Sequence, residues 1–177
     1  AALLKYRIAA IHNPDSSEMW NNIGMCFYGK QKYVASIACL KRALYLDPFQ
    51  WIAAFNLGLV NLHQEQYASA FHYFSVAINW KGDFSNSYMY LGITLNALED
   101  FESACQAFEK ALELESNDCT IYLNYAIVLY NRGYNTLALE LFHASEKIFE
   151  TLDDDEKEPE MLEQREALAE MLDYKLE

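Results

Sequence analysis

The sequence contains no long apolar run, and this absence excludes a membrane-spanning helix. Although 53% of its 177 residues are hydrophobic, no stretch approaches the ~18 consecutive apolar residues that a span requires. Basic residues are also scarce: 13 Lys and Arg stand against 26 Asp and Glu, which gives a net charge of −13. A surface of this sign repels nucleic acid and anionic membranes. We therefore expect no nucleic-acid partner and no direct membrane insertion.

Cysteine, histidine and glycine are too few and too scattered for the common catalytic or metal sites. The four cysteines show neither paired metal-ligand spacing nor a disulfide framework, and we interpret them as reduced thiols in a cytosolic protein. The four histidines stand alone, and the six glycines form no phosphate-binding loop. No two carboxylates form a plausible catalytic dyad. We expect no catalytic residue, no cofactor and no metal, and predict that the chain is not an enzyme.

In place of such motifs, the sequence has a pattern that returns every 34 residues. Three positions of the pattern hold small residues, and one holds a large apolar residue. The small positions are Gly24, Gly58, Gly92 and Ala126, then Ser36, Ala70, Ala104 and Ala138, then Ala43, Ala77, Ala111 and Ser145; the large position is Leu40, Phe74, Phe108 and Phe142. Their spacings of three and four indicate two short helices per unit. The small residues should let the paired helices approach closely, and large residues such as Trp20 should fill the space beside them.

The pattern resembles the tetratricopeptide repeat, which combines an aromatic residue, Leu-Gly, further aromatic residues, alanines and a closing proline. The match covers about residues 17–152. The resemblance implies an all-α fold in which helix pairs stack into a right-handed superhelix. One pair cannot bury its apolar face alone, so stacking on the next pair should supply the core.

The register of the pattern divides the chain into four full repeats and two ends. We predict repeats at residues 17–50, 51–84, 85–118 and 119–152, with Gly29 and Gly133 ending the first helices of the first and last. Residues 1–14 match the second helix of a truncated repeat, so we expect the sequence to begin inside a longer array. Residues 153–177 leave the register and should form an acidic linker and a C-terminal capping helix. Acidic residues concentrate there, with 13 acids and 4 bases after residue 145.

The first helices of this family line the concave face of the superhelix, so the resemblance assigns partner binding to that face. One position per repeat is mostly Asn, which can donate to and accept from a peptide unit of an extended ligand; alternatively, such repeats carry Asn there whatever they bind. The apolar residues around it favour an amphipathic helix or a partner subunit, or else pack between adjacent first helices. The predicted partner-binding residues are Asn22, Met25, Phe55, Asn56, Leu59, Met89, Tyr90, Ile93, Leu123, Asn124 and Ile127.

One known function of the family is not expected here. Repeats that clamp the acidic C-terminal tails of heat-shock chaperones use Lys or Arg at positions that hold Asn21, Asn86 and Tyr90 in this chain. None of these three residues is cationic. A carboxylate clamp is therefore not predicted.

Several longer segments resemble one group of repeat proteins more specifically. These segments are Trp20–Phe27, Cys39–Ala43, Asn56–Val60, Gln66–His72 and Leu123–Ala126. They are similar to the Bardet–Biedl syndrome family of repeat subunits of the BBSome, a coat-like complex that carries membrane proteins into and out of cilia. The resemblance implies a non-catalytic scaffold whose partners are other subunits and centriolar-satellite or motor-adaptor proteins. It also implies a cytoplasmic location at the cilium, the ciliary basal body, the centrosome or the satellites. The alternative is a peptide-motif receptor, such as a co-chaperone or transport adaptor.

Overall fold

The computed structural model describes residues 13–153 and 157–174, and within these ranges the chain is helical and contains no strand. The helices are α2 (Ser17–Tyr28), α3 (Tyr33–Leu46), α4 (Trp51–His63), α5 (Tyr67–Trp80), α6 (Ser85–Ala97), α7 (Phe101–Leu114), α8 (Cys119–Asn131), α9 (Asn135–Phe149) and α10 (Pro159–Met171). The all-α prediction is confirmed. Most of the truncated repeat predicted at residues 1–14 lies outside the described residues.

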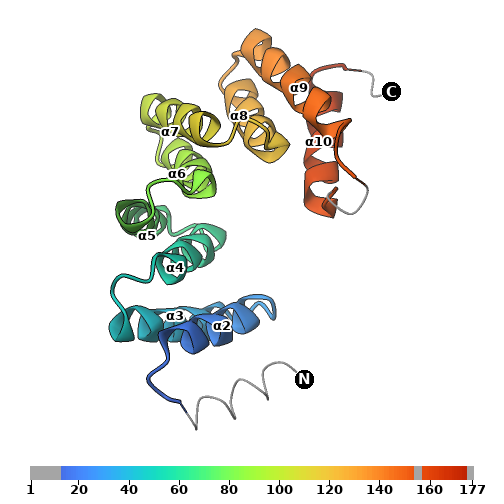
Figure 1. Ribbon diagram of the computed structural model, residues 1–177. Coiled ribbons are helices and arrows are strands. Elements are labelled where there is room, and N and C mark those ends of the chain that lie inside the picture. The colour runs from blue at the N-terminus through green and yellow to red at the C-terminus, as the bar shows by residue number, and fades with distance from the viewer. Residues whose placement is uncertain (1–12, 154–156, 175–177) are drawn as a thin grey trace.

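The helices form pairs that stack one after another into a curved array (Figure 1). The pairs are α2 with α3, α4 with α5, α6 with α7 and α8 with α9, and α10 packs against the last pair. The local sequence explains several helix ends. Ser16 Oγ accepts a hydrogen bond from the Met19 N–H at 3.2 Å, Asp118 caps α8 in the same way, and Pro159 occupies the first turn of α10. These are side chains that favour helix starts.

In each of the first three pairs, a glycine of the first helix packs against a large side chain of the second helix. A Cβ atom on Gly24 would lie 2.7 Å from Leu40 Cγ, one on Gly58 would lie 2.5 Å from Phe74, and one on Gly92 would lie 2.8 Å from Phe108. In the fourth pair Ala126 takes this position and is fully buried, as is Phe142. The close approach of the paired helices thus depends on the absence of a side chain at these positions.

The other residues expected to pack the repeats lie around this contact. Ala70, Ala104 and Ala138 are all fully buried. Trp20 is only partly buried, and its indole Nε1 donates a hydrogen bond to the Pro14 carbonyl oxygen at 2.7 Å. Trp20 therefore also holds the segment that precedes α2.

The turn inside every helix pair uses a left-handed residue at the same repeat position. The φ angles are 57° at Gln31, 56° at Glu65, 66° at Glu99 and 85° at Gly133. The next N–H in each turn bonds a carbonyl five residues back, as from Lys32 to Phe27 at 2.9 Å, which is the Schellman helix end. Gly133 therefore ends α8 by the expected geometry, whereas Gly29 is right-handed with φ −61°.

Replacing Glu65 with glycine should stabilise the protein. A left-handed conformation is strained for any residue with a Cβ atom, and the exposed Glu65 side chain makes no hydrogen bond or ion pair that offsets the strain. We expect Glu65→Gly to raise the free energy of unfolding by roughly 0.5–1 kcal/mol in urea denaturation. The matched control is Gln64→Gly, at a φ of −92°, which should lower it. A lower free energy of unfolding in both variants would show that Glu65 is not strained.

Candidate functional site: the concave groove

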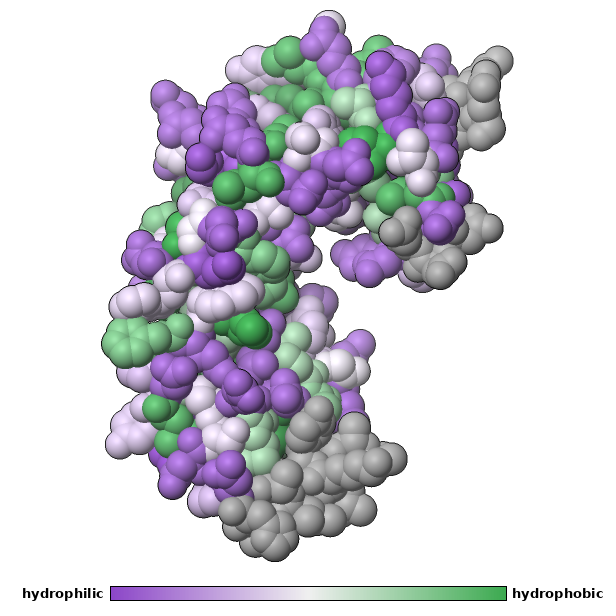
Figure 2. Space-filling view, in the orientation of Figure 1, coloured by the Kyte–Doolittle hydropathy of each residue, from purple (hydrophilic) through white to green (hydrophobic). Residues whose placement is uncertain are grey.

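The inner side of the array holds a groove that α10 closes at one end. Its volume is about 490 Å³, and its lining comes from the first helices of all four pairs, from α10 and from the residue just before α10. The lining residues are Tyr28, Leu59, Leu62, His63, Tyr90, Ile93, Thr120, Asn124, Glu158, Glu160, Met161 and Gln164. The space-filling view has a concave outline on this side (Figure 2).

Four of the predicted partner-binding residues line this groove: Leu59, Tyr90, Ile93 and Asn124. They come from three successive first helices, α4, α6 and α8. The Asn124 amide Nδ2 donates within its own helix to the Thr120 carbonyl oxygen at 2.9 Å. The groove therefore combines apolar side chains with an amide whose oxygen remains available.

Four other predicted residues do not line the groove. Asn22 is exposed and belongs to a second, more polar pocket at the starts of α2 and α4. Met25 packs against a small core of Leu40, Leu57 and Val60. The Phe55 ring contacts three other aromatic rings at 5.2–5.8 Å, and Ile127 packs against the largest core cluster.

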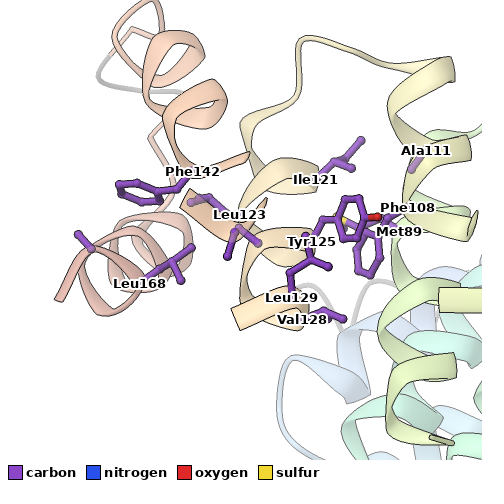
Figure 3. Close-up of a cluster of buried hydrophobic side chains, with 13 residues drawn as sticks. Met89, Phe108, Ala111, Ile121, Leu123, Tyr125, Val128, Leu129, Phe142 and Leu168 are labelled. Atoms are coloured by element: carbon purple, nitrogen blue, oxygen red, sulfur yellow. The ribbon is translucent and has the colours of Figure 1, made fainter. Parts of the chain in front are cut away.

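The remaining three predicted residues are inside the array, which corrects their assignment to a partner surface. Met89 is 3% exposed and Leu123 is 1% exposed. Figure 3 shows Met89 beside Phe108, and Leu123 on the side of α8 that faces Phe142. Asn56 is 8% exposed, and its Nδ2 donates to Asn21 Oδ1 at 2.8 Å. These three side chains pack between adjacent first helices, which is the alternative that the sequence left open. Asn56 is hydrogen-bonded there to Asn21, and Met89 and Leu123 are buried.

Helix α10 forms one wall of the groove, and the repeat positions in the sequence did not predict this wall. Its Leu168 and Ala169 are 0% and 2% exposed and join the core cluster that contains Phe142. Arg165 donates two hydrogen bonds of 2.6 Å to the Glu146 carboxylate on α9. The Arg165 guanidinium carbon also lies 4.2 Å from the Phe149 ring centroid. These contacts hold α10 against the last helix pair, beside the groove.

The groove has a negative electrostatic character. Glu158 and Glu160 are exposed on the α10 side, and the lining includes no lysine or arginine. Burial raises the pKa of the Tyr90 hydroxyl, and the charges of Glu160 and Glu158 raise it further. Burial likewise raises the pKa of Tyr28, with added contributions from Tyr33 and Glu160. The glutamates of α10 thus act on tyrosines of the opposite wall.

The described ranges hold neither a metal site nor a membrane-spanning helix. Residues 13–153 and 157–174 contain no group of three or more His, Cys, Asp or Glu side chains that could hold a metal ion. None of the helices in the described part is long and apolar enough to cross a membrane. Burial raises the pKa of the Cys119 thiol to about 11, with the charges of Asp118 and Glu146 adding to the effect. This thiol is not an activated nucleophile, because activation requires a lowered pKa.

Comparison with family models decides the type of repeat. Models described as tetratricopeptide repeat match residues 1–50, 29–84 and 85–118. The chain belongs to the tetratricopeptide repeat family. A solved structure of MamA from Desulfovibrio magneticus RS-1 superposes with a TM-score of 0.77 at 20% identity, over 86% of each chain. At this identity the likeness concerns the fold of the repeats alone.

Two curated relatives extend the comparison beyond the tetratricopeptide repeat itself. The chain is 47% identical over 169 residues to the BBSome complex member BBS4 of Xenopus tropicalis and 48% identical over 170 residues to that of Mus musculus. Each alignment covers 94% of this chain and 33% of the relative. The resemblance to a BBSome subunit is confirmed, and the chain spans about a third of the length of these relatives.

Proposed function

We propose that the chain is a non-catalytic scaffold segment of a BBSome subunit that acts in transport of membrane proteins to and from cilia. The observation that carries this proposal is the identity of 47–48% to BBSome complex members across 94% of the chain. Its place of action would be the cilium, its basal body, the centrosome or centriolar satellites. Its partners would be other subunits of the complex, together with satellite or motor-adaptor proteins.

Within this function, we assign partner contact to the groove. The groove is lined by Leu59, Tyr90 and Ile93 from successive helices, which provide an apolar strip for one face of a helix or an extended segment. The amide of Asn124 and the hydroxyl of Tyr90 offer polar partners at the same surface. A groove of 490 Å³ holds a few side chains of a partner, so the segment would lie along the strip.

A pull-down from ciliated cells tests this assignment. We expect the double variant Leu59→Ala plus Tyr90→Ala to reduce recovery of BBSome subunits by about tenfold or more, because truncation of contact residues at the centre of an interface removes hot-spot energy. Both side chains are only partly buried, so the array should remain folded, which circular dichroism checks.

The matched control makes the same type of truncation on exposed outer positions. Val34 is 85% exposed and Tyr45 is 74% exposed, both on α3. We expect Val34→Ala plus Tyr45→Ala to leave recovery unchanged. Full recovery with the groove variant, or equal losses in both double variants, would show that the groove is not the contact surface.

A further inference from the structure

We propose that the concave groove receives an arginine side chain of the partner segment, between the start of α10 and the first helices. The site is part of the proposed partner groove, so the inference rests on the proposed function and specifies the chemistry of the partner. Three observations support it: the charge of the groove, its surplus of hydrogen-bond acceptors and its tyrosine rings. Together they fit a planar cation and disfavour an acidic tail.

The charge of the lining is negative and not neutralised within the groove. Glu158 and Glu160 stand at the α10 side, and neither carboxylate forms an ion pair within the described part of the chain. The twelve lining residues contain no lysine or arginine, and His63 is the one histidine among them. A ligand with positive charge is therefore complementary to this surface, and a carboxylate would be repelled.

Two hydrogen-bond acceptors of the groove have no donor among the described residues. Gln164 Oε1 is buried and has no hydrogen-bond partner, although a buried amide oxygen normally has one. The Nδ2 of Asn124 donates to the carbonyl oxygen of Thr120, which leaves the Asn124 oxygen as a further acceptor. An arginine guanidinium carries five donors in one plane and no acceptor, so it supplies the missing groups.

Tyrosine rings complete the fit. Tyr28 and Tyr90 belong to the lining, and the Tyr28 ring meets the His63 ring edge-on at 5.8 Å between centroids. Aromatic faces attract guanidinium groups. Burial and the charge of Glu160 raise the pKa of both tyrosine hydroxyls, so both are neutral hydrogen-bonding groups at neutral pH.

The position of α10 makes the site distinct from a groove built of repeats alone. Glu158, Glu160 and Gln164 all lie on α10 or at its start. The ion pair of Arg165 with Glu146 and the buried Leu168 fix this helix from its middle to its end. The acceptor wall is therefore in place before a ligand binds, which reduces the entropy lost on binding.

Titration with two short peptides tests the inference. The first is a capped alanine peptide with one central arginine, and the second carries citrulline, which has a similar shape and no charge. We expect the arginine peptide to shift the side-chain amide signals of Asn124 and Gln164 in a saturable way at millimolar concentration. Citrulline should bind about tenfold more weakly, because it loses the charge-assisted hydrogen bonds.

Two double variants that remove the same charge test whether the arginine peptide binds at the α10 glutamates. Glu158→Gln plus Glu160→Gln should weaken arginine-peptide binding by about tenfold. The control, Glu102→Gln plus Glu140→Gln, removes the same charge from exposed positions on α7 and α9 and should bind as the unmodified chain does. Equal binding of both peptides, no shift of the groove amides, or unchanged binding in the Glu158 and Glu160 variant would each overturn the arginine site.

The two proposals fail in different ways. If the Leu59 and Tyr90 variant loses BBSome subunits while the arginine peptide does not bind, the scaffold function stands and the arginine site is wrong. If the arginine peptide binds as described but the groove variant recovers all subunits, the groove is a cation site and not the subunit contact.

Discussion

Gly92→Leu is expected to lower the free energy of unfolding by roughly 3 kcal/mol. Even the first added carbon would lie 2.8 Å from two atoms of the Phe108 ring and 3.2 Å from the Ala104 carbonyl oxygen. Phe108 cannot turn aside, because it is fully buried and stacks on Tyr125 with 4.9 Å between ring centroids. Helices α6 and α7 must therefore separate to accept the new side chain.

The control for this variant is the same substitution at a glycine with free space. A Cβ atom on Gly29 would meet only the Met25 carbonyl oxygen, at 3.7 Å, and its φ of −61° suits any residue. Gly29→Leu should therefore change the free energy of unfolding by at most about 0.5 kcal/mol. Urea denaturation followed by circular dichroism measures both. Equal midpoints for the two variants would mean that α6 and α7 do not pack through Gly92.

Leu168→Asp should detach α10 at a loss of roughly 3–5 kcal/mol. Leu168 is fully buried in the cluster that includes Leu123 and Phe142, and a carboxylate there would have no partner to replace water. Because undocking of α10 avoids burying the charge, it should occur in place of global unfolding. Limited proteolysis should then cut within Pro159–Met171 while α2 to α9 stay protected.

Ala167→Asp is the matched control, since the adjacent Ala167 is exposed on the same helix. It should remain resistant to proteolysis and keep its stability within about 0.5 kcal/mol. The Leu168 variant should also lose arginine-peptide binding, because Glu158, Glu160 and Gln164 would leave the groove with α10. Resistance to protease in both variants would contradict the docking of this helix.

The fold could be predicted from the sequence because the repeated positions of small and large residues indicate how the helices pack. Each small residue recurs 34 positions on, opposite a large residue at a fixed offset, so the helix pairs could be derived without coordinates. The left-handed turns could be anticipated at only one place. Gly133 signals such a turn, whereas Gln31, Glu65 and Glu99 take the same conformation with side chains that give no indication of it.

The candidate site was less accessible to sequence reasoning. Repeat position alone cannot distinguish the partly buried Asn124 from the buried Asn56, whose amide bonds to Asn21 one repeat away. The α10 wall was missed for another reason. Its placement depends on Leu168 in the core cluster and on the ion pair of Arg165 with Glu146, and these contacts lie outside the repeat register and leave no periodic signal.

The stacking of neighbouring pairs also has a consequence for folding kinetics. Among the described residues, the helices with extensive mutual contact lie at most two places apart in the chain. Forming each contact therefore closes only a short loop, and the entropic barrier stays low. Any of the four pairs can serve as a nucleus from which order spreads in both directions. Substitutions at one end should then change the unfolding rate of that end first, with the folding rate of the distant pairs almost unaffected.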